Sequence, residues 1–388
     1  MNQQPKIAVV GMACRLPGAE DRAAFETLLR DGQTAFQPIA QADRWAGARP
    51  DAQGATHVGL LQDIAGFDRA PFGMSKTEAP LVDPLHRIFL ETCWTALEDA
   101  GLSPGRMADR HVGVFAGVGP SEYALLQAAA GFPGRSSPYQ NLGVSAAGVC
   151  GRVAYSLDLT GPAQTVDCAC ASGLVALGHA ADSLALGHCA LALAGAVNVL
   201  LDLAVMDSLN AAGVLSATAQ NRSFDAAADG FIRGEGCCVF ALRRLEDAQQ
   251  RGDAILAVLS GWGHRQNGRT NGIMASSAQA QEQGMRQVLS RAGLAPSDIG
   301  FVEGHGSATV MGDKMELAAI ERVFGAAAAS GTPPDVGSVK GNIGHLEAAA
   351  GAAGAAKAVL MLHGGFRAAQ PGFTALATPD LSVTVPRQ

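Results

Sequence analysis

Short apolar runs bounded by glycine alternate along the chain with longer segments whose apolar residues recur every three or four positions. Such runs are typical of buried strands and such segments of amphipathic helices, so their alternation predicts an α/β fold. The first half is predicted to hold strands over 7–11, 112–117, 164–169, 189–194 and 239–242, and helices over 22–30 and 85–100. A further helix follows the strand at 164–169, with a buried face formed by Leu174, Leu177, Ala181 and Leu184.

The second half of the chain repeats this alternation. The pattern predicts strands over 254–259, 300–303 and 336–339, and helices over 278–292, 315–324 and 348–362. In each half a strand leads into a loop with a reactive side chain and then into a helix. Because α/β sheets gather active sites at strand ends, this order indicates two related layers that face one site.

The composition of the chain indicates a globular protein and disfavours nucleic-acid binding and membrane insertion. The 388 residues are 48% hydrophobic and 16% charged, which is enough to bury a sizeable core. The formal net charge is -7 and there is no basic block, so we expect no nucleic-acid partner. An uncharged stretch over 183–201 contains Gly187-His188 and Asn198, and fits a helix, a turn and a buried strand better than a membrane span. We therefore expect a cytoplasmic protein without a membrane segment.

The eight cysteines form no C-x-x-C pair, and no histidine cluster has zinc-ligand spacing, so we expect no metal. Most lie inside apolar runs, which is typical of buried side chains in a reducing compartment. Cys170 stands where the strand at 164–169 gives way to a helix. A helix N-terminus favours a thiolate and offers N–H groups to an oxyanion, although a packing cysteine fits the position equally well. Cys168 is expected to face the core.

Two histidines and one lysine are further candidates for chemistry. His305 and His345 each lie in a glycine-flanked loop directly after a predicted strand. A lone histidine is more often structural than catalytic, but the repeated placement favours a shared site. Lys340, one of five lysines, follows an apolar strand where a solvated side chain is unexpected; the alternative is an ordinary loop cation.

Three segments that carry these residues resemble the signatures of β-ketoacyl synthases. They are Asp167-x-x-Cys170 followed by Leu174-Val175-Ala176, His305-Gly306-Ser307-x-Thr309, and Lys340-x-Asn342-x-Gly344-His345. Further stretches are similar to the ketosynthase domains of polyketide synthases, namely 10–18, 83–84, 98–101 and 224–236. The matches follow the order of the family over nearly the whole chain.

The resemblance implies a decarboxylative Claisen-type condensation in polyketide or fatty-acid biosynthesis. Cys170 would hold an acyl group as a thioester. His305 and His345 would polarise the malonyl thioester carbonyl and stabilise the enolate that forms when CO2 leaves, while Lys340 would orient and charge the site. The hydroxyls of Ser307 and Thr309 would hydrogen-bond the phosphopantetheine arm of an acyl carrier protein. This carrier is the expected partner, and no cofactor is expected on the chain itself.

The fold implied by the resemblance is thiolase-like, with two related halves in five α-β-α-β-α layers. We expect an N-terminal half over 1–250 that carries the nucleophile, and a C-terminal half over 251–388 that carries the two histidines. A homodimer, or a heterodimer with a related subunit, would form around 164–167. The acyl chain would enter beside Phe231 and the segment over 138–149.

Two departures from the family pattern leave alternatives open. Ala308 stands where the family usually has glycine, and is expected to crowd the pantetheine tunnel. The chain also stops at Gln388, before the family's final strand and a Gly-Phe-Gly-Gly loop that donates an N–H to the oxyanion hole. Loss of one such donor typically costs about 10²–10³ in rate. The alternative is therefore a silent, chain-length-factor-like partner subunit or a truncated inactive fragment. A thiolase is disfavoured because it would typically carry a second cysteine near His345.

Overall fold

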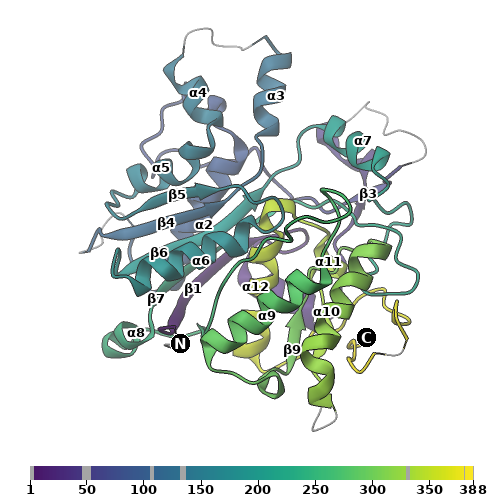
Figure 1. Ribbon diagram of the computed structural model, residues 1–388. Coiled ribbons are helices and arrows are strands. Elements are labelled where there is room, and N and C mark those ends of the chain that lie inside the picture. The colour runs from purple at the N-terminus through teal and green to yellow at the C-terminus, as the bar shows by residue number, and fades with distance from the viewer. Residues whose placement is uncertain are drawn as a thin grey trace.

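A six-stranded mixed sheet forms the centre of the N-terminal half (Figure 1). The computed structural model describes residues 4–45, 54–104, 109–131, 137–328, 333–379 and 381–387. The strands follow the order β5-β4-β6-β7-β1-β8, with bounds β1 Ile7–Arg15, β4 Val112–Gly117, β5 Ala163–Val166, β6 Leu191–Asn198, β7 Gly236–Arg244 and β8 Ala257–Leu259. β4 pairs in parallel with β5 and β6, whereas β7 is antiparallel to both β6 and β1.

Helices cover both faces of this sheet because successive strand residues point to opposite sides. Val114 packs with α2 (Pro84–Asp99) and α5 (Ala146–Ser156) on one face. Phe115, the next residue, packs with α6 (Ser172–Ala185) and α12 (Ala350–Gly364) on the other. Both faces of the sheet are covered at its centre, so β4 and β6 are fully buried runs without charged residues, whereas the edge strand β5 is partly exposed.

A second, smaller sheet lies beyond α12. Its parallel strands are β9 (Phe301–Glu303) and β10 (Asp335–Gly337), and α12 contacts β9. On the outer side α9 (Ala278–Ala292) packs against α10 (Val310–Ala328), and both contribute to the core beside Val336. The layers therefore alternate α-β-α-β-α, which confirms the predicted arrangement.

The remaining elements connect these layers. They are α1 Arg22–Arg30, α3 Glu122–Ala129, α4 Pro138–Val144, α7 Leu203–Ala211, α8 Leu245–Arg251, α11 Lys340–Ile343, a small antiparallel pair of β2 Gln37–Pro38 and β3 His57–Val58, and five short 3-10 turns. Within the described residues, every helix falls short of the length and apolar character that crossing a bilayer requires.

Most sequence-predicted elements are present with small shifts at their ends. α1, β4 and α9 agree with the prediction at both ends, and the stretch over 183–201 is the end of α6, a turn and the buried strand β6. The expected strand over 164–169 ends earlier, at Val166, and the helix expected over 315–324 begins at Val310. Six of the eight cysteines are buried, as expected, namely Cys14, Cys93, Cys150, Cys189, Cys237 and Cys238.

Two burial predictions are wrong. Cys168 is exposed rather than in the core, because β5 ends at Val166 and strand alternation no longer applies two residues later. Leu174 has 55% of its surface exposed although its spacing places it on the buried face of α6. It lies over Gly351, which has no side chain to cover it.

Candidate active site

A tight turn between β5 and α6 presents Cys170. Ala169 adopts a left-handed backbone conformation with φ of 50°, which reverses the chain after the strand. The Ser172 hydroxyl donates to the Ala169 carbonyl at 2.6 Å and accepts the Cys168 N–H at 2.8 Å. This closed turn holds the half-buried Cys170 two residues before α6 begins, at the positive end of the helix dipole.

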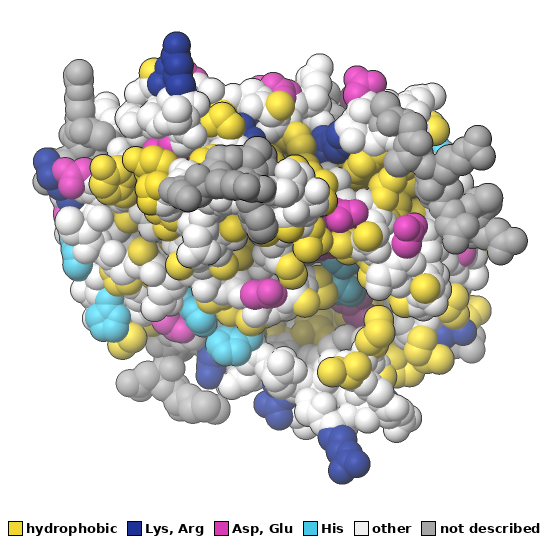
Figure 2. Space-filling view, turned by 90° about the horizontal axis from the view of Figure 1, so that it is seen from above, with side chains coloured by type: hydrophobic (Ala, Val, Ile, Leu, Met, Phe, Trp, Pro, Cys, Tyr) yellow, Lys and Arg dark blue, Asp and Glu magenta, His cyan; other side chains and the backbone are white. Residues whose placement is uncertain are grey.

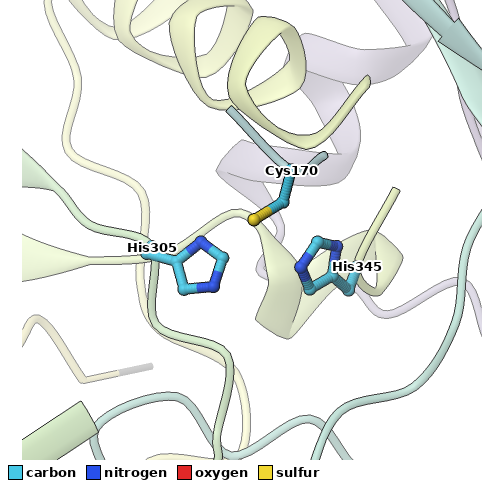
Figure 3. A group of neighbouring side chains, drawn as sticks. All are labelled: Cys170, His305 and His345. Atoms are coloured by element: carbon cyan, nitrogen blue, oxygen red, sulfur yellow. The ribbon is translucent and has the colours of Figure 1, made fainter. Parts of the chain in front are cut away.

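Three separate segments converge on the Cys170 thiol. Cys170 Sγ and one ring nitrogen each of His305 and His345 all lie within 4.8 Å of one another. The ring centroids of the two histidines are 5.3 Å apart, and the rings are nearly perpendicular, at 80°. Figure 3 shows the sulfur pointing between the two rings. His345 is buried and His305 exposed, so the site opens on one side. From above, Figure 2 shows a histidine at the bottom of a hollow in the surface.

The His305 loop is held by its backbone from both sides. It leaves the end of β9, and the Glu316 carboxylate on α10 accepts the N–H groups of His305 and Gly306 at 2.6 and 2.8 Å. From the opposite side, the Lys340 ammonium donates to the His305 carbonyl at 2.5 Å. These contacts fix the main chain and leave the imidazole free to face the thiol.

Lys340 is a buried cation at the start of α11. Only 3% of its surface is exposed, and burial lowers the pKa of its ammonium, while the carboxylates of Glu316 and Glu303 oppose this shift. Its backbone is placed by Val339, whose N–H donates to Glu303 at 2.5 Å. The alternative of an ordinary loop cation does not fit this placement, because a solvated lysine would not be buried between the two histidine loops.

His345 is held in one tautomer. The Glu347 N–H donates to Nδ1 of His345 at 2.9 Å, so Nδ1 must be unprotonated. A neutral ring then carries its hydrogen on Nε2 and presents a donor. The Phe231 ring lies against this imidazole, with the ring centroids 4.9 Å apart.

Both imidazoles are neutral at physiological pH. The Lys340 charge is the main cause that lowers the pKa of His305 to about 3, and desolvation adds to it. Burial, followed by the Lys340 charge, holds the pKa of His345 well below its usual range. Neutral imidazoles can donate a hydrogen bond without adding a full charge to the site. The arrangement therefore suits the stabilisation of a developing oxyanion beside a nucleophilic sulfur.

Comparison with known proteins decides the family. The model of the β-ketoacyl synthase N-terminal domain matches residues 4–248, and that of the C-terminal domain matches residues 256–374. The chain belongs to the β-ketoacyl synthase family.

Its relatives include large polyketide synthases. The chain is 43% identical over 385 residues to a mycocerosic acid synthase-like polyketide synthase from Mycobacterium tuberculosis, which covers 96% of this chain and 18% of the relative. It is 42% identical over 360 residues to the erythronolide synthase EryA3 of Saccharopolyspora erythraea, with 92% of this chain and 11% of the relative covered. The chain thus spans less than a fifth of the length of either.

Solved structures support the same fold. The ketosynthase from module 6 of the bacillaene synthase of Bacillus subtilis 168 matches with a TM-score of 0.89 and 34% identity, over 99% of this chain and 66% of that chain. An oxazolomycin ketosynthase domain from Streptomyces albus matches with a TM-score of 0.88. The fold of this β-ketoacyl synthase is therefore thiolase-like, as predicted.

The hydroxyls of Ser307 and Thr309 lie next to each other in this β-ketoacyl synthase, with 2.9 Å between Oγ and Oγ1. Between them Ala308 is fully buried and has φ of 58°. The expectation that Ala308 crowds a tunnel is therefore wrong, because its methyl group has no exposed surface with which to line one. Asp313 accepts the Ala308 N–H at 3.1 Å and the Phe224 N–H at 2.5 Å, and burial raises its pKa to about 7.

Sequence reasoning missed the acidic residues that hold the loops. Glu316 and Asp313 lie in the first turns of α10, directly after the His305 loop, and Glu347 lies two residues after His345. For Glu316 and Asp313 the available signal was their position, because carboxylates near a helix start readily accept N–H groups from the preceding loop.

Proposed function

We propose that the chain is an acyltransferase of the β-ketoacyl-[acyl-carrier-protein] synthase type. It would condense an acyl group held on Cys170 with a malonyl-type extender on an acyl carrier protein, in polyketide or fatty-acid biosynthesis. The observation that carries this proposal is the convergence of Cys170 Sγ with two neutral imidazoles inside 4.8 Å.

The first step is transfer of the acyl group. The Cys170 sulfur attacks the carbonyl carbon of an acyl thioester on the phosphopantetheine arm, and a new carbon–sulfur bond forms. The old carbon–sulfur bond breaks, and the released pantetheine thiolate takes the proton that Cys170 gave up. The position of Cys170 at a helix N-terminus supports this role.

The second step forms the new carbon–carbon bond. The malonyl thioester oxygen accepts hydrogen bonds from His305 and from Nε2 of His345. The carbon–carbon bond to the malonyl carboxylate breaks, CO2 leaves, and the bond electrons stay on the thioester as an enolate. The enolate carbon attacks the acyl–Cys170 carbonyl, and the Cys170 thiolate departs. Preorganised neutral donors support this step because negative charge develops on the oxygen that they face.

The remaining predicted residues have supporting roles. Lys340 would hold the His305 loop and charge the site, while Ser307 and Thr309 would hydrogen-bond the pantetheine amides. We infer that no metal takes part, since the Lys340 charge would repel a divalent cation and Nε2 of His345 carries a proton. The only cofactor-like group is then the arm of the carrier protein.

We further propose a dimer through the strand β5, in a cytoplasmic protein. β5 pairs only with β4 among the described residues, and its outer edge is free to pair with a second copy or a related subunit. We propose an N-terminal half over 1–250 and a C-terminal half over 251–388, with β8 (Ala257–Leu259) of the second range added to the edge of the first sheet through its pairing with β1.

Intact-mass measurement tests the nucleophile. After incubation with an acyl-N-acetylcysteamine thioester, we expect one acyl adduct on the wild type and none on Cys170→Ala. Cys168→Ala is the matched control, because Cys168 is the exposed neighbour and its loss should leave the adduct intact. An adduct that persists in Cys170→Ala would contradict the assignment.

Release of CO2 from a malonyl thioester tests the two histidines. We expect His305→Ala and His345→Ala each to lower the rate by about 10²-fold or more, as for loss of an oxyanion donor. His188→Ala, on an exposed turn, is the control and should leave the rate unchanged. A wild type that neither acylates nor decarboxylates would favour the silent partner subunit instead.

A further inference from the structure

A fully buried guanidinium lies behind the active site. Arg233 has no exposed surface, and its Nε donates to the Glu347 carboxylate at 2.6 Å while Nη2 donates to Glu122 at 3.0 Å. Glu122 is anchored in turn, because its second oxygen accepts the N–H groups of Leu201 and Asp202 at 2.6 and 2.7 Å. The cation is thus clamped between two carboxylates.

This clamp is joined directly to His345. The His345 N–H donates to the Ile232 carbonyl at 2.7 Å, and the Gly234 N–H donates to the His345 carbonyl at 2.9 Å, so the backbones on either side of Arg233 and His345 are paired. The Glu347 N–H is the group that meets Nδ1 of His345. Arg233 is therefore linked to His345 in two ways, through the paired backbones and through Glu347.

Glu347 would not adopt its backbone conformation without support. Its φ is 48°, in the left-handed region that non-glycine residues disfavour by about 1–2 kcal/mol. The strained residue is the same one whose N–H donates to Nδ1 of His345. The ion pair to Arg233 fixes the side chain of the same residue, and so holds the strained turn in place.

Stability alone does not account for this ion pair. Buried ion pairs are often no more stabilising than apolar residues of the same volume, because burying the charges costs about as much as their attraction returns. The Arg233 charge also acts on the site itself, since it adds to the burial and the other charges that hold the pKa of His345 low.

We propose that Arg233 is a positioning residue: clamped by Glu122 and Glu347, it holds the Glu347 N–H on Nδ1 of His345 and so keeps the Nε2 hydrogen directed into the active site. The catalytic consequence rests on the proposed condensing function. The structural consequence, a single His345 tautomer, does not depend on that function.

The test measures the tautomer and the reaction separately. Protein with ¹⁵N-labelled histidine rings is examined by long-range ¹H–¹⁵N NMR, with the His345 signals assigned by their loss in His345→Ala. The variants are Arg233→Met, which removes the cation, and Glu347→Gln, a milder change that keeps the side chain's length. Arg152→Met is the matched control, because Arg152 forms another largely buried ion pair, 2.6 Å from Glu78.

In the wild type and in Arg152→Met we expect an unprotonated Nδ1 and a protonated Nε2. In Arg233→Met and Glu347→Gln we expect a mixture of the two neutral tautomers of His345, because burial and the Lys340 charge still hold its pKa low. The rate of CO2 release should fall about 10- to 100-fold, while KM and acylation of Cys170 change little. If Arg233→Met does not fold, Glu347→Gln carries the test.

A wild-type tautomer and rate in folded Glu347→Gln and Arg233→Met would overturn the positioning role. A changed tautomer in an enzyme whose wild type releases no CO2 would instead keep the positioning role and reject the proposed function. Arg233→Lys should keep more of the rate than Arg233→Met, because lysine retains the charge but not the paired donors.

Discussion

The charge state of the two imidazoles is set by one neighbouring cation and by burial. An unperturbed histidine becomes protonated below about pH 6.5, whereas the pKa of His305 is lowered to about 3 and that of His345 lies well below its usual range. Their neutral donor forms therefore persist far into acidic solution. The oxyanion site should work without a histidine titration near neutrality.

The pH dependence of decarboxylation follows from these shifts. Single-turnover CO2 release should show no histidine titration from about pH 8 to about pH 5, and the Asp313 carboxyl, whose pKa is raised to about 7, is the group of this loop that titrates near neutrality. Circular dichroism at each pH checks that the fold persists. A rate that still falls with an apparent pKa near 6.5 in Asp313→Asn, which removes that carboxyl, would mean that a histidine titrates normally and that the neutral pair is wrong.

Gly306 is the residue on which the His305 loop turns. Its φ is 45°, and an added Cβ would lie 2.6 Å from Ser338 Cβ and 2.9 Å from the Phe224 ring. We expect Gly306→Ala to lower the free energy of unfolding by about 2 kcal/mol or more, through strain and overpacking. CO2 release should fall as well, because the loop carries His305.

Ala308→Gly is the control for the same loop. Ala308→Gly relieves the left-handed strain, which raises the free energy of unfolding. It also removes a buried methyl group and increases the entropy of the unfolded chain, which both lower it, so we expect little net change. Urea unfolding of both variants measures the difference. Equal stability of Gly306→Ala and the wild type would contradict the geometry of the turn.

At the scale of elements, the contact between α6 and α12 brings the nucleophile to the histidine loops. An added Cβ on Gly173 would lie 2.8 Å from the Ala352 nitrogen and 3.1 Å from its Cβ. The first turn of α6 can approach α12 this closely only because Gly173 has no side chain. The small residues of α12 serve the same close packing between the two sheets.

This packing predicts opposite effects for two glycines of α6. Gly173→Ala should destabilise the protein by about 1–3 kcal/mol, because the backbone of α12 must move. Gly178→Ala should stabilise it by up to about 1 kcal/mol, since its Cβ would meet only Trp262 Cδ1 at an ordinary 3.7 Å and alanine favours a helix. Thermal or urea unfolding compares the pair; the same sign for both would contradict the helix contact.

The elements could be predicted from the sequence where hydrophobic periodicity decides them. α9 ends at Gly293, whose left-handed conformation is the expected helix stop, and β4 is a fully buried run with glycine near each end. Periodicity failed at Cys168 and Leu174, because the first follows a strand that has already ended and the second lies over a glycine of another helix. Such neighbours depend on tertiary packing, which a local pattern does not contain.

The candidate site was predictable to a similar degree. Cys170, His305, His345 and Lys340 could be selected because each stands where a strand meets a loop or helix. The groups that hold them could not be selected from the sequence. The Glu316 carboxylate accepts backbone N–H groups, which every loop offers, and Arg233 pairs with carboxylates more than a hundred residues away in the sequence. Ion pairs between distant segments leave no periodic signal.

At the scale of the whole molecule, the two halves contribute different parts of one site. The first sheet and α6 present the thiol, and the loops after β9 and β10 present the imidazoles and the ammonium. Neither half carries a complete site among the described residues. The central claim is therefore that the assembled halves form a carbon–carbon bond, and do not merely bind or decarboxylate a thioester.

The most direct measurement loads Cys170 with an acyl group, adds malonyl-acyl carrier protein, and follows the carrier by intact mass. We predict a β-ketoacyl carrier whose chain is two carbons longer than the loaded acyl group, with one CO2 released for each product. His345→Ala should remain acylated at Cys170 and form no such product. Release of CO2 from the wild type without a lengthened chain, or no reaction of the acylated enzyme, would contradict the account.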